Sequence, residues 1–96
     1  MSRDGSFEQL DELANQHIND DDLNVRLQAV ESKMMIVYQD LQTDPSAGDR
    51  LAELLNTRLA TAQAVLDAGA TGEDRARTVL RILSSFRELT RLQIEG

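Results

Sequence analysis

The chain has no cysteine and no tryptophan, and its 96 residues include one proline, one histidine and one lysine. The absence of cysteine excludes a disulfide framework, thiolate-bound zinc and thiol chemistry. No apolar run approaches the ~20 residues that a membrane-spanning helix needs. The start, Met-Ser-Arg-Asp-Gly, lacks the apolar segment of a secretory signal peptide. We therefore expect a cytoplasmic protein, or one exported without such a signal as part of a secretion apparatus.

Catalytic and cofactor-binding patterns are also missing. The chain has no glycine-rich phosphate loop and no dinucleotide fingerprint. His17 has no second set of strong ligands beside it, and Asp20–Asp22 lack the ligand spacing and the bend glycine of a calcium loop. A helical enzyme of the chorismate mutase class would need several cations on its apolar stripes, which are not found here. We expect no enzymatic activity, no metal, no cofactor and no small-molecule substrate.

A helical pattern covers nearly the whole chain. Apolar residues make up 41% of the sequence and charged residues 28%, which suits a soluble helical domain. The apolar residues recur at helical spacing, and no alternating strand pattern is found. The sequence predicts an all-α fold, an antiparallel bundle of three main helices plus a short N-terminal helix, in one domain of residues 1–96. Residues 1–5 are expected to be flexible.

Local signals place the helix ends. A short first helix begins at Ser6, and Asp20–Asp22 meet the positive end of a second helix spanning Leu23–Leu41. Loops are expected at 43–49 and 69–72. In the first loop, Asp44 precedes a proline that suits the first helical position, although Asp49 is an alternative cap. In the second, Gly69 is a good residue to end the third helix, and Thr71 with Asp74 resembles a capping box for the last one.

The core is expected along one stripe of each main helix. In the second helix the stripe has a coiled-coil-like spacing of alternating steps of four and three. The expected core residues are Leu23, Leu27, Val30, Met34, Val37, Leu41, Leu51, Leu55, Leu59, Ala62, Leu66, Val79, Leu83 and Phe86.

The second helix carries more apolar residues than one neighbour can cover. Met35, Ile36 and Tyr38 lie beside its main stripe. In so small a domain, surplus apolar surface suggests an oligomer or a protein partner. We therefore take these three residues as candidate partner-binding residues.

Charge is unevenly distributed along the chain. The net charge is −7, and residues 1–48 account for all of it, with ten acidic and three basic side chains. Residues 75–92 contain five arginines and a single acidic residue, Glu88. Arg77, Arg81, Arg87 and Arg91 are candidates for binding an acidic partner, and a solvated helix face is the alternative. Nucleic-acid binding by this arginine-rich helix is a further alternative, although it lacks interleaved aromatic residues.

The segment 41–55 contains the polar stretch Thr-Asp-Pro-Ser-Ala-Gly-Asp. This segment resembles the needle and inner-rod subunits of type III secretion systems. Those subunits are small helical hairpins joined by a polar loop. The matching parts here are the helix 23–41, the loop 43–49 and the helical stretch from Arg50 onward. This chain lacks their aromatic pair, and Gly69–Gly72 interrupts the terminal helix. The resemblance implies a self-assembling subunit, and a small secretion chaperone is a related possibility.

Taken together, these features predict a non-enzymatic protein–protein interaction module. It either assembles with copies of itself or binds a helix of a partner. One alternative is a small acidic regulator of phage or plasmid type, which inhibits a host protein by mimicking nucleic acid through its carboxylates. The other is a DNA-binding regulator that uses the last helix.

Overall fold

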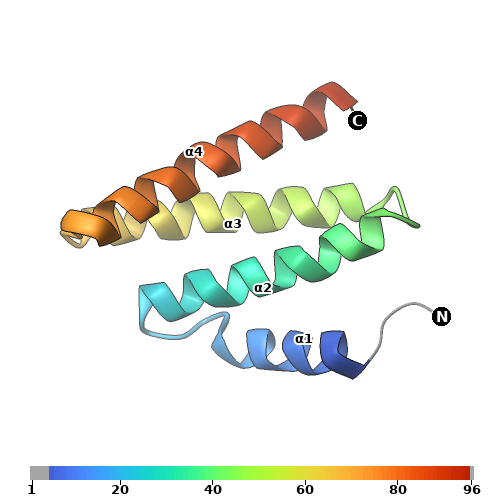
Figure 1. Ribbon diagram of the computed structural model, residues 1–96, viewed down its shortest axis with the longest axis horizontal. Coiled ribbons are helices and arrows are strands. Elements are labelled where there is room, and N and C mark those ends of the chain that lie inside the picture. The colour runs from blue at the N-terminus through green and yellow to red at the C-terminus, as the bar shows by residue number, and fades with distance from the viewer. Residues whose placement is uncertain (1–4, 96) are drawn as a thin grey trace.

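The computed structural model describes the backbone of residues 5–95 and the side chains of residues 8–94. It contains four helices, α1 (Gly5–His17), α2 (Leu23–Leu41), α3 (Ala47–Asp67) and α4 (Gly72–Glu95), and no strand in this part of the chain. Consecutive helices run antiparallel, with α3 between α2 and α4 (Figure 1). The all-α helical bundle predicted from the sequence is thus confirmed. The N-terminal residues expected to be flexible lie, except for Gly5, outside the described residues.

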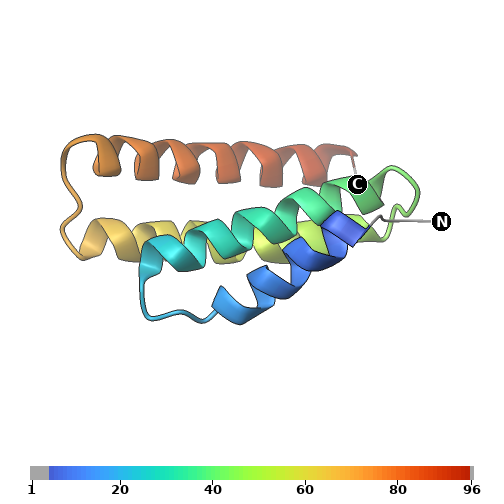
Figure 2. The same ribbon diagram turned by 60° about the horizontal axis from the view of Figure 1, so that its bottom comes forward.

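Each helix packs on its neighbour in the chain. Among the described residues, α1 packs on α2, α2 on α3 and α3 on α4. Figure 2 shows α1 on the side of α2 that faces away from α4. Because α4 packs closely with α3 alone, a large part of its circumference is left without a neighbouring helix.

The start of α2 follows the cap that the sequence predicted. The Asp22 carboxylate accepts a hydrogen bond from the Asn24 N–H at 2.9 Å and caps α2. Asp20 accepts one from the Asp22 N–H at 2.9 Å and lies 3.3 Å from His17 Nδ1. The backbone hydrogen bond from Asp22, followed by the one from His17, lowers the pKa of Asp20. Asp20 and Asp22 therefore have a structural role at the α1–α2 junction.

The α2–α3 loop is built around Asp44. Its carboxylate accepts hydrogen bonds from the Ser46 N–H at 3.0 Å and the Ser46 hydroxyl at 2.7 Å, and these bonds lower its pKa. Its carbonyl accepts the Ala47 N–H at 3.0 Å. Asp44 and Pro45 thus form a tight turn that leads into α3. The helix begins at Ala47 with Ser46 as its N-cap, so the prediction that Asp44 caps α3 and that Pro45 takes its first position is wrong. Asp49 lies in the first turn of the helix and is not the cap either.

The α3–α4 loop begins with a glycine-dependent helix ending. Gly69 has a φ of +98°, a conformation that residues with a side chain rarely adopt. The Gly69 N–H bonds to the Leu66 carbonyl and the Ala70 N–H to the Val65 carbonyl, which is the Schellman pattern. The predicted stop at Gly69 is confirmed. Gly72 also has a positive φ, +60°, and α4 begins there.

Most of the expected core is buried between α2 and α3. The seven expected residues that are buried are Leu27, Val30, Met34, Val37, Leu51, Leu55 and Ala62. The partly buried ones are Leu23, Leu41, Leu59, Leu66 and Val79. The expectation is wrong for Leu83 and Phe86, which are 59% and 51% exposed. Both lie on the side of α4 that faces away from α3.

Helix α1 covers a second side of α2. Ala29 and Ile36, seven residues apart on α2, are 4% and 3% exposed, and Ala14 of α1 is 3% exposed. Lys33 Nζ donates to Asp11 Oδ1 at 3.1 Å and to Asn15 Oδ1 at 2.6 Å, so this side of α2 faces α1. The expectation that Ile36 adds to a surplus exposed surface is therefore wrong, because the short first helix covers it.

Candidate functional site

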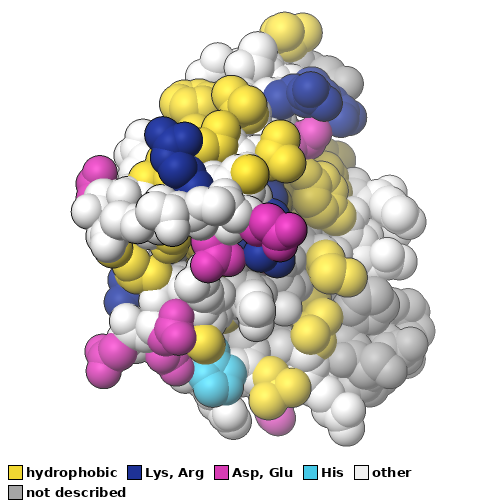
Figure 3. All heavy atoms as spheres, turned by 60° about the vertical axis from the view of Figure 1, so that its left-hand side comes forward, with side chains coloured by type: hydrophobic (Ala, Val, Ile, Leu, Met, Phe, Trp, Pro, Cys, Tyr) yellow, Lys and Arg dark blue, Asp and Glu magenta, His cyan; other side chains and the backbone are white. Residues whose placement is uncertain are grey.

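The side of α4 opposite α3 exposes several large apolar side chains to solvent. Leu80, Leu83, Phe86 and Ile94 lie there with exposures of 64%, 59%, 51% and 79%. Their steps of three, three and eight residues keep them on one side of a helix with 3.6 residues per turn. We call these four residues the α4 outer face. Figure 3 shows hydrophobic side chains gathered over the upper part of the molecule, where α4 lies, with basic side chains among them.

The side of α4 that meets α3 is small and polar at its two most buried positions. Thr78 is 1% exposed and Ser85 is 0% exposed. Their hydroxyls donate to carbonyls of their own helix, Asp74 O at 2.6 Å and Arg81 O at 2.7 Å, so burying them leaves no hydroxyl unsatisfied. Ile82, Leu89 and Leu92 complete this contact as partly buried residues. Helix α4 thus exposes large apolar side chains while burying small hydroxyls.

The arginines of α4 differ in what they contact. Arg81 is held by Glu31 of α2, with Nε at 3.0 Å from Oε2. Arg77 pairs with Asp74 at 3.1 Å and Arg91 with Glu88 at 3.3 Å, both within one turn of α4, and the two arginines themselves are well exposed. Arg87 has no hydrogen bond or ion pair among the described residues. The structure therefore assigns Arg81 to internal packing and leaves the Arg87 guanidinium unpaired among the described residues.

Arg75, which was not among the sequence candidates, also has no partner among residues 8–94. It lies eleven residues, or three turns, before Phe86, on the same border of the outer face. Arg87 lies seven residues after Leu80 and borders the other side. One unpaired guanidinium therefore flanks each edge of the α4 outer face.

A groove runs along one edge of this face. It has a volume of about 450 Å³ and is lined on the α4 side by Leu80, Leu83, Ser84 and Arg87. Glu31 of α2 and Arg58 of α3 line its other wall. Arg58 Nη2 lies 2.9 Å from Glu31 Oε2, so one carboxylate holds an arginine from α3 and another from α4. This ion cluster fixes α4 relative to the hairpin of α2 and α3.

The three candidates on α2 are not brought together. Ile36 is buried, Met35 is 60% exposed, and Tyr38 is 38% exposed. The Tyr38 hydroxyl donates to Glu88 Oε2 of α4 at 3.1 Å. Partial burial, and next the Glu88 carboxylate, raise the pKa of Tyr38 above its ordinary 10.0. Tyr38 is thus a second link between α2 and α4, and Met35 is the exposed apolar residue of the three.

The raised pKa of Tyr38 can be measured directly, because the chain has one tyrosine and no tryptophan. We expect its tyrosinate absorbance to titrate with a midpoint above 10.0 in the folded protein. Since the folded state favours the neutral phenol, this contribution to stability is fully present below pH 10 and is lost as the pH rises through the folded pKa. In Glu88→Gln the midpoint of the Tyr38 titration should fall but stay above 10.0, because Tyr38 remains partly buried. A midpoint at or below 10.0 in the wild-type protein would contradict the contact between Tyr38 and Glu88.

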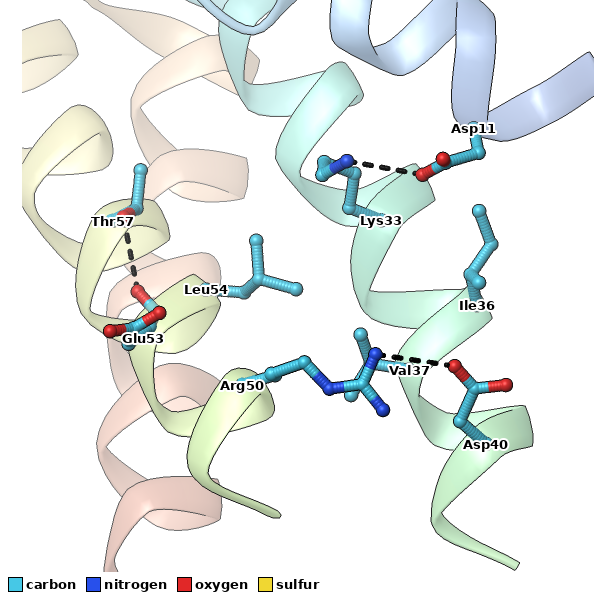
Figure 4. Close-up of a pocket in the computed structure, with 9 residues that line it drawn as sticks. All are labelled: Asp11, Lys33, Ile36, Val37, Asp40, Arg50, Glu53, Leu54 and Thr57. Carbon is cyan, nitrogen blue, oxygen red and sulfur yellow. Dashed lines mark hydrogen bonds and ion pairs between the residues drawn. The ribbon is translucent and has the colours of Figure 1, made fainter. Parts of the chain in front are cut away.

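A hollow of about 400 Å³ between α2 and α3, with Asp11 of α1 at its edge, is lined mainly by charged and apolar side chains (Figure 4). Its cations already have carboxylate partners: Lys33 pairs with Asp11 at 3.1 Å and Arg50 with Asp40 at 3.5 Å. Thr57 donates its hydroxyl to the Glu53 carbonyl at 3.0 Å. With these groups satisfied inside the molecule, the hollow offers no activated nucleophile or free cation.

A further hollow, of about 780 Å³, lies between the C-terminal half of α4 and the beginning of α3. Leu41, Pro45, Leu89 and Leu92 form much of its apolar wall. Leu89 and Leu92 point toward the core and lie on the side of α4 opposite the outer face. A ligand on the α4 outer face therefore leaves this hollow open.

No protein-family model matches the chain, and neither a curated protein nor a solved structure matches it. Within residues 5–95, no helix is both long and apolar enough to span a bilayer. In the same part of the chain, no three histidine or acidic side chains are grouped as metal ligands would be. The α4 outer face and its arginines thus remain the surface from which a function can be argued.

Proposed function

We propose that the chain is a non-enzymatic protein–protein interaction module that binds one amphipathic helix of another protein along the α4 outer face. The observation that carries this proposal is the orientation of α4, which buries Thr78 and Ser85 and exposes Leu80, Leu83 and Phe86. A helix in this orientation leaves apolar area in water that a second helix would cover. Anchors at three- and four-residue spacing are the usual contacts when a helix docks in a groove.

The charge of the chain favours another protein over a second copy as the occupant. Each copy has a net charge of −7, so two copies repel each other over a long range. Residues 75–92, with five arginines and one glutamate, have a net charge of +4 (5 − 1). Placing α4 against α4 of a second copy would therefore bring two positive segments together. A partner helix with carboxylates beside its apolar stripe would instead place negative charge against this positive segment.

The resemblance to type III secretion subunits suggests a setting for this module. In that setting the chain is an apparatus component or a small chaperone, and its partner is another helical component. The matched parts are α2, the loop that follows it and the stretch from Arg50 onward, which contains most of α3 and α4. Helix α1 packs on α2. The docking face lies on α4, outside the 41–55 segment that carries the resemblance.

The proposal is tested with a labelled synthetic helical peptide that has leucines at i, i+3, i+4 and i+7, and with a scrambled peptide of the same composition. We expect the first peptide to bind and the scrambled one not to bind, as measured by fluorescence anisotropy. Leu83→Ser/Phe86→Ser should weaken binding at least about tenfold, since each large apolar group buried contributes roughly 1.5–3 kcal/mol.

Met35→Ser is the matched control, because Met35 is also about 60% exposed but lies on α2. It should leave the affinity unchanged, and circular dichroism should show the same helix content in all three proteins. Sedimentation of the protein alone should give a folded monomer over a wide concentration range. A dimer that Leu83→Ser/Phe86→Ser dissociates would overturn the choice of occupant, and equal binding of both peptides would overturn the docking face.

A further inference from the structure

We infer that the partner helix carries carboxylates along both borders of its apolar stripe. This inference rests on the proposed function, and it defines the chemistry of the partner. It is carried by Arg75 and Arg87, the two α4 arginines that have no partner among the described residues. Each lies on a different border of the α4 outer face, as their spacing from Phe86 and Leu80 requires.

These two arginine side chains have no ion pair in the described part of the chain, although the chain contains more carboxylates than cations. Residues 8–94 contain fifteen carboxylate side chains and nine cationic ones, so acidic partners are in excess. Every other described cation has a hydrogen bond or an ion pair within the molecule: Arg26, Lys33, Arg50, Arg58, Arg77, Arg81 and Arg91. The two exceptions both lie beside the α4 outer face.

Two further arginines can extend the Leu80 border, because Arg77 lies three residues before Leu80 and Arg91 eleven residues after it. Arg77 and Arg91 are each 62% exposed and pair only with a carboxylate one turn away on α4. The Arg77–Asp74 pair is exposed on both sides and contributes little to stability, so Arg77 can turn to a partner at low cost. Glu88, the carboxylate that pairs with Arg91, is 22% exposed and also accepts a hydrogen bond from Tyr38. Arg81, in contrast, is 21% exposed and bound to Glu31, and we do not include it in the docking surface.

Carboxylates on a docked helix would form ion pairs at the edge of an apolar contact. Such peripheral charges act mainly on the association rate and on partner choice, and their effect decreases as salt is added. The apolar residues of the α4 outer face would then supply most of the affinity, and the arginines would select the partner. This separation allows the two proposals to be tested independently.

The test uses three helical peptides that share one leucine stripe and have glutamate, glutamine or lysine at the flanking positions. We expect the glutamate peptide to bind wild-type protein about threefold to tenfold more tightly than the glutamine peptide at low salt. The lysine peptide should bind least tightly, and the differences should shrink as sodium chloride is added.

Arg75→Gln/Arg87→Gln should remove most of the preference for the glutamate peptide while leaving the affinity for the glutamine peptide unchanged. The matched control is Gln16→Glu/Gln39→Glu, which changes the net charge by the same two units at exposed positions on α1 and α2. It should keep most of the preference. If both variants lost the preference for the glutamate peptide, the net charge of the protein alone would explain that preference. This result would overturn the role of Arg75 and Arg87.

The remaining outcomes separate the two proposals. If the three peptides bind equally well, the inference about carboxylates is wrong and the docking face stands. If none of them binds, both are wrong. A short DNA duplex serves as the competing acidic probe; if the duplex binds more tightly than the glutamate peptide and requires Arg75 and Arg87, the partner is nucleic acid and the inference is overturned.

Discussion

Leu55→Ala should lower the free energy of unfolding by about 2–5 kcal/mol, whereas Leu83→Ala should change it by no more than about 0.5 kcal/mol. The same atoms are removed in both variants, and only the surroundings differ. Leu55 is 0% exposed between α2 and α3, so its removal leaves a cavity. Leu83 is 59% exposed on the α4 outer face, so water already occupies most of its surroundings.

Urea denaturation followed by far-ultraviolet circular dichroism measures both variants, since the chain has no tryptophan. A domain of this size has a total stability of roughly 5–10 kcal/mol, so the loss expected for Leu55→Ala is a large fraction of it. Equal losses in the two variants would mean that α4 buries the face assigned here to solvent, and the docking proposal would then lose its basis.

Glu31→Gln should lower the free energy of unfolding by about 1–2 kcal/mol, between the values typical of exposed and of buried ion pairs. The Glu31 carboxylate binds Arg58 with Nη2 at 2.9 Å and Nε at 3.1 Å. It also binds Arg81 with Nε at 3.0 Å and Nη2 at 3.3 Å. These two guanidinium groups are 14% and 21% exposed, so removing the charge between them leaves two partly buried cations facing each other.

Glu53→Gln provides the comparison, because Glu53 is exposed on α3 and its carboxylate has no ion pair among the described residues. It should change the stability by less than about 0.5 kcal/mol. In Arg81→Gln, the effect of adding Glu31→Gln should be smaller than in the wild type, since the two residues share one cluster. Additive effects would show that Glu31 does not link α2 to α4.

The sequence alone determined the features that depend on a few neighbouring residues. Asp22 caps α2 and Gly69 ends α3, because each satisfies backbone groups within three or four positions. The stripe Leu27, Val30, Met34 and Val37 is buried as expected, because its spacing leaves one face of α2 for a neighbour. For the same reason the all-α fold could be predicted with no relative to compare.

Only the tertiary structure decided which side of α4 is buried. Its apolar residues extend around more than half of the helix, so the sequence could not choose between the side with Leu83 and the side with Leu89. The side with Leu89 is the buried one. Thr78 and Ser85 on that side are small enough to lie against α3, and their hydroxyls donate hydrogen bonds to carbonyls of their own helix. The tertiary structure likewise placed Ile36 under α1. It paired Arg81 with a glutamate 50 positions away, and left Arg75 and Arg87 unpaired. Burial and long-range pairing depend on which faces meet in three dimensions, and local spacing does not determine that.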